Sequence, residues 1–285
     1  MRISILGAAG FLGQNLAHRL VSEGHHVTGY VLNPSNADLG FESKSILSFL
    51  NSAPTSTLHF DVTINLAARR STRNQPLTEV EVHKYTYEIP RQFIMRTARA
   101  QTIVLNASTY IQNFEGVDAK TVDSYGAAKQ QLSQFLAEES ETYGFRTLDL
   151  YLFTIYGQGD RQTHLVPSLI SAAKKGEGIS LSPGNQLMNL IYIDDVVRNF
   201  STALSTTDQF CYRRHFMWNE EYISVRDLVE SIESVGGVEI DCLWGERPYA
   251  GHEMFEPWHI PMTQIPGFEA RVTLQKGLRE LWSLS

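Results

Sequence analysis

The chain has 285 residues, of which 42% are hydrophobic and 19% are charged. This composition excludes wholesale disorder and suits one large domain, or a large domain with a small lobe. The formal net charge of −7 argues against a nucleic-acid partner, because proteins that bind a phosphate backbone normally carry a basic surface. Cys211 and Cys242 have neither disulfide nor metal-site spacing, and the histidines form no ligand pair, so we expect no metal.

Targeting and membrane segments are not expected either. The apolar run at the N-terminus breaks at Gly7, which is too early for a signal peptide. The sequence contains no apolar stretch of about 18 residues, the length that would span a bilayer. These features predict a cytoplasmic protein with no membrane contact.

The predicted elements alternate between strands and helices along the first two thirds of the chain. A strand ends in a glycine-rich turn, and a helix with apolar residues at helical spacing follows and stops near Gly24. The helix expected over residues 79–98 contains Pro90, which must kink or interrupt it. The predicted strands cover residues 3–6, 26–32, 62–67, 102–105, 147–153 and 190–193, and the other predicted helices cover residues 44–50, 124–143, 164–175, 195–204, a segment starting at Ser224, and 274–281.

The glycine turn is the first functional signal. Gly7, Gly10 and Gly13 lie between the first strand and the first helix. The first glycine permits a tight turn, the second allows a pyrophosphate to approach the backbone, and the third lets helix and strand pack closely. Free N–H groups at the start of the helix then hold the phosphate charge. The turn therefore predicts a dinucleotide site.

Tyr125 and Lys129 form the main chemical signal. They are four residues apart on a predicted helix, so their side chains share one face and can meet one ligand. An ammonium near a phenol favours the phenolate and lowers the tyrosine pKa, which predicts proton exchange between Tyr125 and an alcohol or sugar oxygen. The small residues between them keep this helix face open for a cofactor. A serine–threonine pair, Ser108-Thr109, follows a predicted strand and places hydroxyls at the same edge of the sheet.

These motifs together resemble the extended short-chain dehydrogenases/reductases, the NAD-dependent epimerase/dehydratase family. The glycine turn "GAAGFLG", the segment "DVTINLAAR" and the strands "LYLFTIYGQGD" and "NLIYIDDVV" follow one another in the order of that family. Within it, the sequence is most similar to nucleotide-sugar 4-ketoreductases such as the CDP-paratose synthases. The resemblance covers nearly the whole chain.

The resemblance implies an α/β fold: a Rossmann-type doubly wound parallel sheet of about seven strands, with a small C-terminal substrate-binding lobe. Residues 1–157 would form the dinucleotide-binding domain, to which residues 188–215 return. Residues 158–187 and 216–285 would form the substrate-binding lobe. The resemblance also implies a homodimer.

Site residues follow from the same resemblance. The catalytic set is Thr109, Tyr125 and Lys129, with Ser108 as the alternative hydroxyl that contacts substrate. The substrate diphosphate is expected at Arg247, and Arg69 and Arg70 are expected to face cofactor or substrate. The residues expected to contact the cofactor are Gly7, Gly10, Phe11, Leu12, Gly13, Leu66, Ala67, Ala68, Tyr125 and Lys129.

Two departures from the family pattern bear on the reaction. The second strand ends in Val31-Leu32, where an acidic residue would select NAD, so NADP(H) is slightly favoured over NAD(H). Tyr110 and Ile111 follow Thr109 in place of the Asp-Glu pair of the dehydratases, so neither can act as a carboxylate acid or base.

Three hypotheses remain open on the sequence. The first is NAD(P)H-dependent reduction of the 4-keto group of an NDP-4-keto-6-deoxy sugar in bacterial surface-polysaccharide or deoxysugar biosynthesis, O-antigen formation included. The second is an NAD-dependent NDP-sugar 4-epimerase, which would use the same residues. The third is a non-catalytic dinucleotide-sensing regulator on the same fold, a class that typically lacks the pair formed by Tyr125 and Lys129.

Overall fold

The computed structural model describes residues 1–34, 39–53, 59–72, 75–114, 121, 123–161, 163–205, 210–258 and 263–284. They pack into two compact units. Unit 1 comprises Met1–Leu152, Val197–Met217 and Met262–Pro266, and unit 2 comprises Phe153–Val196, Trp218–Pro261 and Gly267–Ser285. Compared with the division expected from the sequence, residues 153–157 and 188–196 belong to unit 2. The roles assigned to the two units stay predictions.

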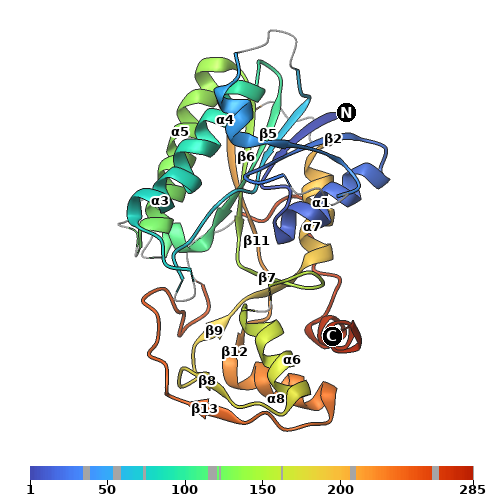
Figure 1. The fold of residues 1–285 in the computed structure, drawn as a ribbon, viewed down its shortest axis with the longest axis vertical. Coiled ribbons are helices and arrows are strands. Elements are labelled where there is room, and N and C mark those ends of the chain that lie inside the picture. Colours follow the sequence, from blue (N-terminus) through green and yellow to red (C-terminus); the bar gives the residue numbers. More distant parts are fainter. Residues whose placement is uncertain are drawn as a thin grey trace. The chain divides into compact units, whose positions relative to one another are not determined.

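Unit 1 is built around one parallel sheet (Figure 1). Its seven strands follow the order β11-β6-β5-β4-β1-β2-β3, and every adjacent pair is parallel. This confirms the predicted doubly wound sheet. The strands are β1 (Arg2–Leu6), β2 (His26–Val31), β3 (Glu42–Ser45), β4 (Val62–Asn65), β5 (Ile103–Thr109), β6 (Arg146–Leu152) and β11 (Tyr212–Met217).

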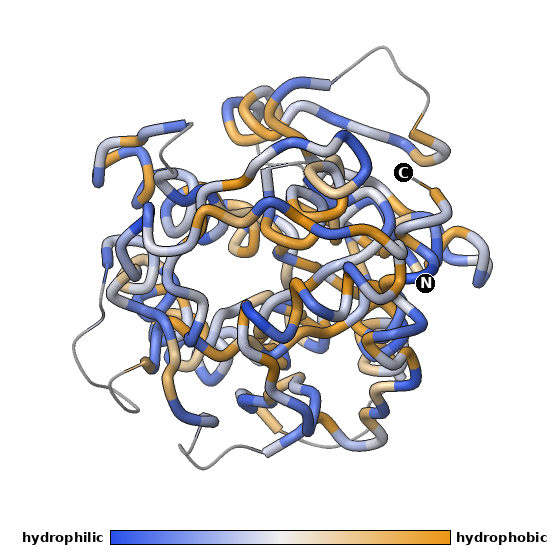
Figure 2. Tube along the Cα trace, turned by 90° about the horizontal axis from the view of Figure 1, so that it is seen from below, coloured by the Kyte–Doolittle hydropathy of each residue, from blue (hydrophilic) through white to orange (hydrophobic). Residues whose placement is uncertain are grey.

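The helices of unit 1 connect these strands. In Figure 2, hydrophilic and hydrophobic residues alternate along the coils, the pattern of helices that bury one face. Gly144 ends α5 in the left-handed conformation, at the position where the sequence predicts a helix stop. The helices are α1 (Phe11–Ser22), α2 (Ile46–Asn51), α3 (Glu79–His83), the π-helix η1 (Lys84–Glu88), α4 (Ile89–Thr97), the 3-10 helix η2 (Tyr110–Asn113), α5 (Ser124–Tyr143) and α7 (Ile193–Ala203), which continues into unit 2.

Parallel strands bring the ends of β1, β4 and β5 to one edge of the sheet. Leu6 pairs with Asn65, and Asn65 pairs with Asn106 in the adjacent strand. Strand β5 runs on to Thr109, opposite Leu152 at the end of β6. The segments that follow these strands therefore begin side by side at the carboxyl edge, where ligands of such sheets bind.

Several features differ from the sequence predictions. The sheet strand at 212–217 was not predicted, and the predicted strand at 190–193 pairs in unit 2 instead of the sheet. Two further differences are local. The helix expected from Lys44 starts at Ile46, because Glu42–Ser45 pairs with β2 as an edge strand and Ser45 caps the helix. The helix expected over residues 79–98 is continuous but contains η1 directly before Pro90. A proline lacks the N–H and clashes with the carbonyl four residues earlier, and the wider turn before it accommodates the ring.

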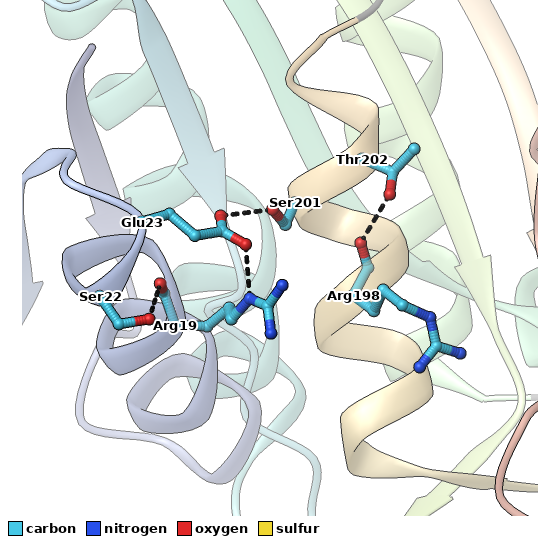
Figure 3. A network of polar contacts seen from close by, with 6 residues as sticks. All are labelled: Arg19, Ser22, Glu23, Arg198, Ser201 and Thr202. Atoms are coloured by element: carbon cyan, nitrogen blue, oxygen red, sulfur yellow. Dashed lines mark hydrogen bonds and ion pairs between the residues drawn. The ribbon is translucent and has the colours of Figure 1, made fainter.

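Unit 1 is held together by apolar packing and a few polar links. Its core includes Tyr30 and Phe93, whose rings lie 5.0 Å apart, and the aliphatic side chains of α5. A polar link joins α1 to α7, because Glu23 accepts a hydrogen bond from Ser201 and pairs with Arg19 (Figure 3). This link fixes the far end of α1, whose beginning is the glycine turn.

The described part of unit 2 has three short two-stranded ladders and three helices of its own. The ladders pair β7 (Thr154–Tyr156) with β10 (Leu190–Tyr192), β9 (Leu187–Met188) with β12 (Ile223–Ser224), and β8 (Ile179–Leu181) with β13 (Cys242–Trp244). The helices are α6 (Leu165–Lys175), α8 (Val225–Gly236) and α9 (Leu274–Leu284). Within the described residues of the whole chain, no helix combines the length and apolarity needed to cross a bilayer.

Candidate active site

The glycine turn has the geometry of a phosphate cradle. Gly7 takes a positive φ of 86°, and the N–H of Gly10 donates to the Gly7 carbonyl at 2.9 Å. Gly10 is the N-cap of α1 and supplies no side-chain cap. The first N–H groups of α1, from Phe11 to Gly13, have no acceptor within the helix, which is the arrangement that binds anions at helix N-termini.

Close packing explains the outer glycines of the turn. A Cβ atom on Gly13 would lie 2.2 Å from the Gly7 carbonyl oxygen, so no other residue fits there without moving the turn. A Cβ on Gly7 would meet the backbone of Leu66 and Ala67 at 3.0 Å. The turn therefore fits the pyrophosphate of a dinucleotide cofactor, with Leu66-Ala67-Ala68 beside it.

Hydrogen bonds hold the segment after β4 to the sheet edge at its start and to η1 at its end. The N–H of Leu66 donates to the Leu6 carbonyl at 2.9 Å, and the N–H of Ala67 donates to Asn65 Oδ1 at 3.2 Å. Arg69 exchanges backbone hydrogen bonds with the Thr86 hydroxyl, and its guanidinium lies over the Tyr85 ring at 5.1 Å. These contacts place Arg69 and its neighbour Arg70 at the rim of the carboxyl edge.

Tyr125 lies in the first turn of α5 and is partly buried. The Arg70 guanidinium sits 5.6 Å from the centre of its ring, and Asp123 holds that guanidinium by an ion pair of 2.8 Å. Asp123 also caps α5, accepting from the N–H of Gly126 at 2.7 Å. Sequence reasoning missed Asp123, although an aspartate directly before a predicted helix is a recognisable cap.

Burial raises the pKa of Tyr125 to about 12. The positive charge of Arg70 opposes this rise, whereas Asp123 and Tyr110 add to it. The sequence predicts that Lys129 lowers this pKa, but in the structure the cation acting on the phenol is Arg70. At neutral pH, Tyr125 therefore keeps its proton and is available as a proton donor.

Lys129 has entirely different surroundings. Its side chain is 2% exposed, and Nζ donates to the carbonyl oxygen of Ala107 on β5 at 2.5 Å. Burial lowers the pKa of Lys129 to about 8, and the charge of Asp149 opposes this decrease. Lys129 is therefore mostly charged at neutral pH. Because this pKa lies close to neutral pH, a change in the charges near Lys129 alters the charged fraction.

Thr109 and Ser108 face opposite sides of β5, as neighbouring strand residues do. Thr109 ends the strand and caps η2, accepting from the Ile111 N–H at 3.4 Å. The Ser108 hydroxyl instead donates to Asp149 and also contacts Ser133, so it is engaged inside the unit. The structure thus favours Thr109 as the hydroxyl at the carboxyl edge, while both substrate roles stay predictions.

The remaining predicted residues lie in other parts of the chain, and their roles stay predictions. Arg247 is an exposed residue of unit 2, and its N–H donates to the Leu181 carbonyl at 3.0 Å. Val31 ends β2. Ser35 and Asn36 follow it as polar loop residues that the sequence offers for a 2′-phosphate, and they lie outside the described residues. Unit 2 also has an open cavity of about 690 Å³ between α6 and α9, lined by Pro167, Ile170 and Leu281 among others, which the sequence did not indicate.

The fold and the site define a class of protein: a Rossmann-type α/β enzyme with a glycine turn for a dinucleotide and a tyrosine–lysine pair. The profile described as "NAD dependent epimerase/dehydratase family" matches residues 3–216. The chain belongs to this family, whose members place it among NAD(P)-dependent oxidoreductases and epimerases.

Relatives with assigned names support this placement. A CDP-abequose synthase of Yersinia pseudotuberculosis is 27% identical over 210 residues, covering 69% of this chain and 71% of the relative. A CDP-abequose synthase of Salmonella muenchen is 21% identical over 292 residues, covering 99% and 97%. A UDP-glucuronic acid 4-epimerase variant from Bacillus cereus, solved with NAD and UDP-4-deoxy-4-fluoro-glucuronic acid, superposes with a TM-score of 0.82 at 20% identity, over 99% of this chain and 98% of that one.

Proposed function

We propose that the protein reduces the 4-keto group of an NDP-4-keto-6-deoxy sugar with NAD(P)H. The observation that carries this proposal is the placement of Tyr125: a partly buried phenol in the first turn of α5, at the carboxyl edge and 5.6 Å from the Arg70 guanidinium. Such a phenol is fully protonated at neutral pH and can serve as the acid that a ketone reduction requires.

Each residue of the site has a role in this reaction. The cofactor, when bound, supplies the hydride that adds to the C4 carbon. Tyr125 donates its phenolic proton to the carbonyl oxygen, which becomes the alcohol, and the resulting phenolate later regains a proton from solvent. Arg70, at 5.6 Å from the ring, stabilises the phenolate while it exists. Thr109 donates a hydrogen bond to the same carbonyl oxygen.

Lys129 acts on the cofactor side of the site. Its ammonium lies one helical turn beyond Tyr125 and would bond the ribose hydroxyls of the cofactor. NADP(H) is preferred over NAD(H) in this proposal, because β2 ends in Val31 and Leu32 follows, so no carboxylate stands there to repel a 2′-phosphate. The substrate would be a nucleotide-diphosphate sugar, and the names of the CDP-abequose synthases favour a CDP-linked one.

Elimination of water is disfavoured as the reaction. Tyr110 and Ile111, the first residues of η2, follow Thr109 where the dehydratases carry an acid pair, and neither side chain can transfer a proton as a carboxylate. The same Thr109, Tyr125 and Lys129 would serve a 4-epimerase, which returns its cofactor to the starting state. The two activities therefore differ in whether the cofactor is consumed.

The test is a turnover assay with purified protein. CDP-linked 4-keto-6-deoxy sugars are incubated with NADPH or NADH, and the absorbance at 340 nm is followed together with the sugar product. One NADPH oxidised per alcohol formed supports the reductase. Tightly bound NAD released by acid from the purified protein, with sugar interconversion and no net oxidation, would instead establish the epimerase. Oligomeric state and cytoplasmic location stay predictions.

A further inference from the structure

A buried carboxylate lies behind the catalytic helix. Asp149 is in the middle of β6 and is fully buried. Its Oδ1 atom accepts from Asn106 Nδ2 at 2.8 Å and from the Ser108 hydroxyl, and its Oδ2 atom accepts from the Tyr212 hydroxyl at 2.6 Å. An aspartate inside a strand buried on both faces is unusual, because a charge removed from water is strongly unfavourable unless polar partners surround it.

Hydrogen-bond donors surround this carboxylate. The amide nitrogen of Asn106 can only donate, so Oδ1 accepts. The Tyr212 hydroxyl receives a hydrogen bond from Arg214 Nε at 3.3 Å and directs its own proton at Oδ2. In each of these hydrogen bonds a carboxylate oxygen of Asp149 accepts, so its polar atoms are satisfied inside unit 1.

Asp149 and Lys129 hold three consecutive residues of β5 between them. The carboxylate binds the side chains of Asn106 and Ser108, and the ammonium binds the carbonyl of Ala107, which lies between these two. The two charges are therefore separated by one stretch of strand inside the same unit, with little water to screen them. The charge of Asp149 raises the pKa of Lys129 against the effect of burial.

Other charged groups on the packed elements contribute less to Lys129. Among the described residues, Asp149 is the group whose charge acts on it appreciably. The titratable or charged residues on α5 and on the elements that contact it are Glu79, Glu81, His83, Lys84, Tyr85, Tyr87, Glu88, Arg91, Arg96, Tyr110, Tyr125, Glu138, Glu139, Glu141, Tyr143, Arg146, Asp149, Tyr151, Tyr212, Arg213, Arg214 and His215.

We infer that Asp149 is a positioning residue of the active site: through Asn106 and Ser108 its buried carboxylate fixes the strand segment whose Ala107 carbonyl holds the Lys129 ammonium, and its charge acts on that ammonium across the strand. The inference rests on the proposed function for its catalytic meaning. The electrostatic effect of Asp149 on Lys129 does not depend on that function. Neither the glycine turn nor the tyrosine–lysine pair predicts a carboxylate at position 149.

The test is the titration of Lys129 in the Asp149→Asn variant. Asparagine keeps the volume and can still accept from Asn106 and Ser108, but it carries no charge. Lysine ε-carbon NMR on ¹³C-labelled protein reports the titration directly, with Lys129→Met assigning the signal. We expect the midpoint of Lys129 to fall by about one pH unit in Asp149→Asn. An unchanged midpoint would overturn the inference.

Tyr212→Phe is the matched control. It removes one hydrogen bond from the same carboxylate but leaves the charge, so the Lys129 midpoint should stay near that of the unaltered protein. A fall in Tyr212→Phe as large as in Asp149→Asn would show that packing, not charge, is responsible, and would overturn the inference. If Asp149→Asn does not fold, Asp149→Ser, which leaves room for water as an acceptor, is expected to give the same fall.

Catalysis supplies a separate readout. If the reductase assay succeeds, the alkaline limb of kcat should move to lower pH in Asp149→Asn by the same amount as the NMR midpoint. If the alkaline limb of kcat stays in place while the NMR midpoint of Lys129 moves, Asp149 has no role in catalysis. Absence of reductase activity in the unaltered protein would defeat the proposed function, and the NMR result would still decide the charge coupling.

Discussion

Tyr125 and Lys129 lie one turn apart on α5, yet their surroundings are opposite. Tyr125 is partly buried near the rim beside a cation, Arg70. Lys129 is fully buried, and one stretch of β5 separates it from an anion, Asp149. Burial drives both groups toward their neutral forms, raising one pKa to about 12 and lowering the other to about 8. The charge of Arg70 opposes the rise in the pKa of Tyr125, and the charge of Asp149 opposes the decrease in the pKa of Lys129. The pKa of Tyr125 and the pKa of Lys129 thus respond to different residues, Arg70 and Asp149, and can be changed separately.

The largest expected effect is on the proton donor. Tyr125→Phe removes the phenolic proton and should lower kcat by about 10³-fold, within the range typical of acid catalysts. Dinucleotide affinity should stay within about threefold, because the glycine turn is untouched. Stopped-flow reduction and a fluorescence titration measure the two quantities. Tyr143→Phe, at the exposed end of the same helix, is the control, and an active Tyr125→Phe enzyme would refute the assignment.

The glycine turn should respond in binding rather than in chemistry. Gly13→Val places a side chain where even a Cβ lies 2.2 Å from the Gly7 carbonyl oxygen, so the turn must move. We expect dinucleotide affinity to fall by more than about tenfold and the free energy of unfolding to drop by about 1–3 kcal/mol. Calorimetric titration and urea unfolding test this. Gly251→Ala, at a site with open space around it, should change neither quantity.

Arg70 should affect turnover but not cofactor binding. Arg70→Gln removes the cation that stabilises the phenolate, and kcat should fall by about tenfold. Arg70→Lys should recover part of this loss. Arg91→Gln removes a similar guanidinium, 5.0 Å from the Phe135 ring on α5 and away from Tyr125, and should leave kcat unchanged. Equal rates for Arg70→Gln and Arg91→Gln would contradict the role of Arg70.

The smallest effects concern stability against pH. The pKa of Lys129 falls from an ordinary 10.5 to about 8 on folding, so between these pH values the unfolded chain binds more protons and stability rises with pH. The gain amounts to at most about 3 kcal/mol. Lys129→Met should abolish this rise in the thermal midpoint. A midpoint that is flat from pH 8 to 10 in the unaltered protein would contradict it.

Tyrosines act with the opposite sign above pH 10. Burial raises the pKa of Tyr30 and Tyr125 to about 12, so the folded protein keeps phenolic protons that the unfolded chain has released. The stability that these two tyrosines contribute is therefore complete below pH 10 and is lost as the pH rises toward 12. Absorbance at 295 nm and circular dichroism should show tyrosine ionisation and unfolding occurring together. Full ionisation with the fold intact would show that these phenols are not buried.

Local signals in the sequence identified much of the fold and the first layer of the site. The glycine spacing, the helix from Ser124 to the stop at Gly144 and the parallel sheet follow from patterns within a few residues. The edge strand at Glu42–Ser45 was missed, because its polar residues carry no apolar alternation and only pairing with β2 makes it a strand.

The groups that act on the catalytic pair come from distant parts of the chain. Arg70 lies 53 residues from its partner Asp123, and the Tyr212 hydroxyl meets Asp149 across 63 residues. No local periodicity encodes such contacts, since they depend on strand order. The sequence did hold one sign of the buried network: Asp149 interrupts the apolar strand between Leu148 and Leu150. A charge at such a position indicates a partner elsewhere in the fold.

The most direct test of the account is a binding titration of the purified protein with NADPH and NADH, followed by quenching of the protein's fluorescence, after acid release has identified any dinucleotide already held. The account predicts one saturable dinucleotide site per chain, tighter for NADPH, weakened in Gly13→Val and retained in Tyr125→Phe. Absence of binding by either dinucleotide, with none released by acid, would contradict the central claim that the glycine turn and the tyrosine–lysine pair form a cofactor site.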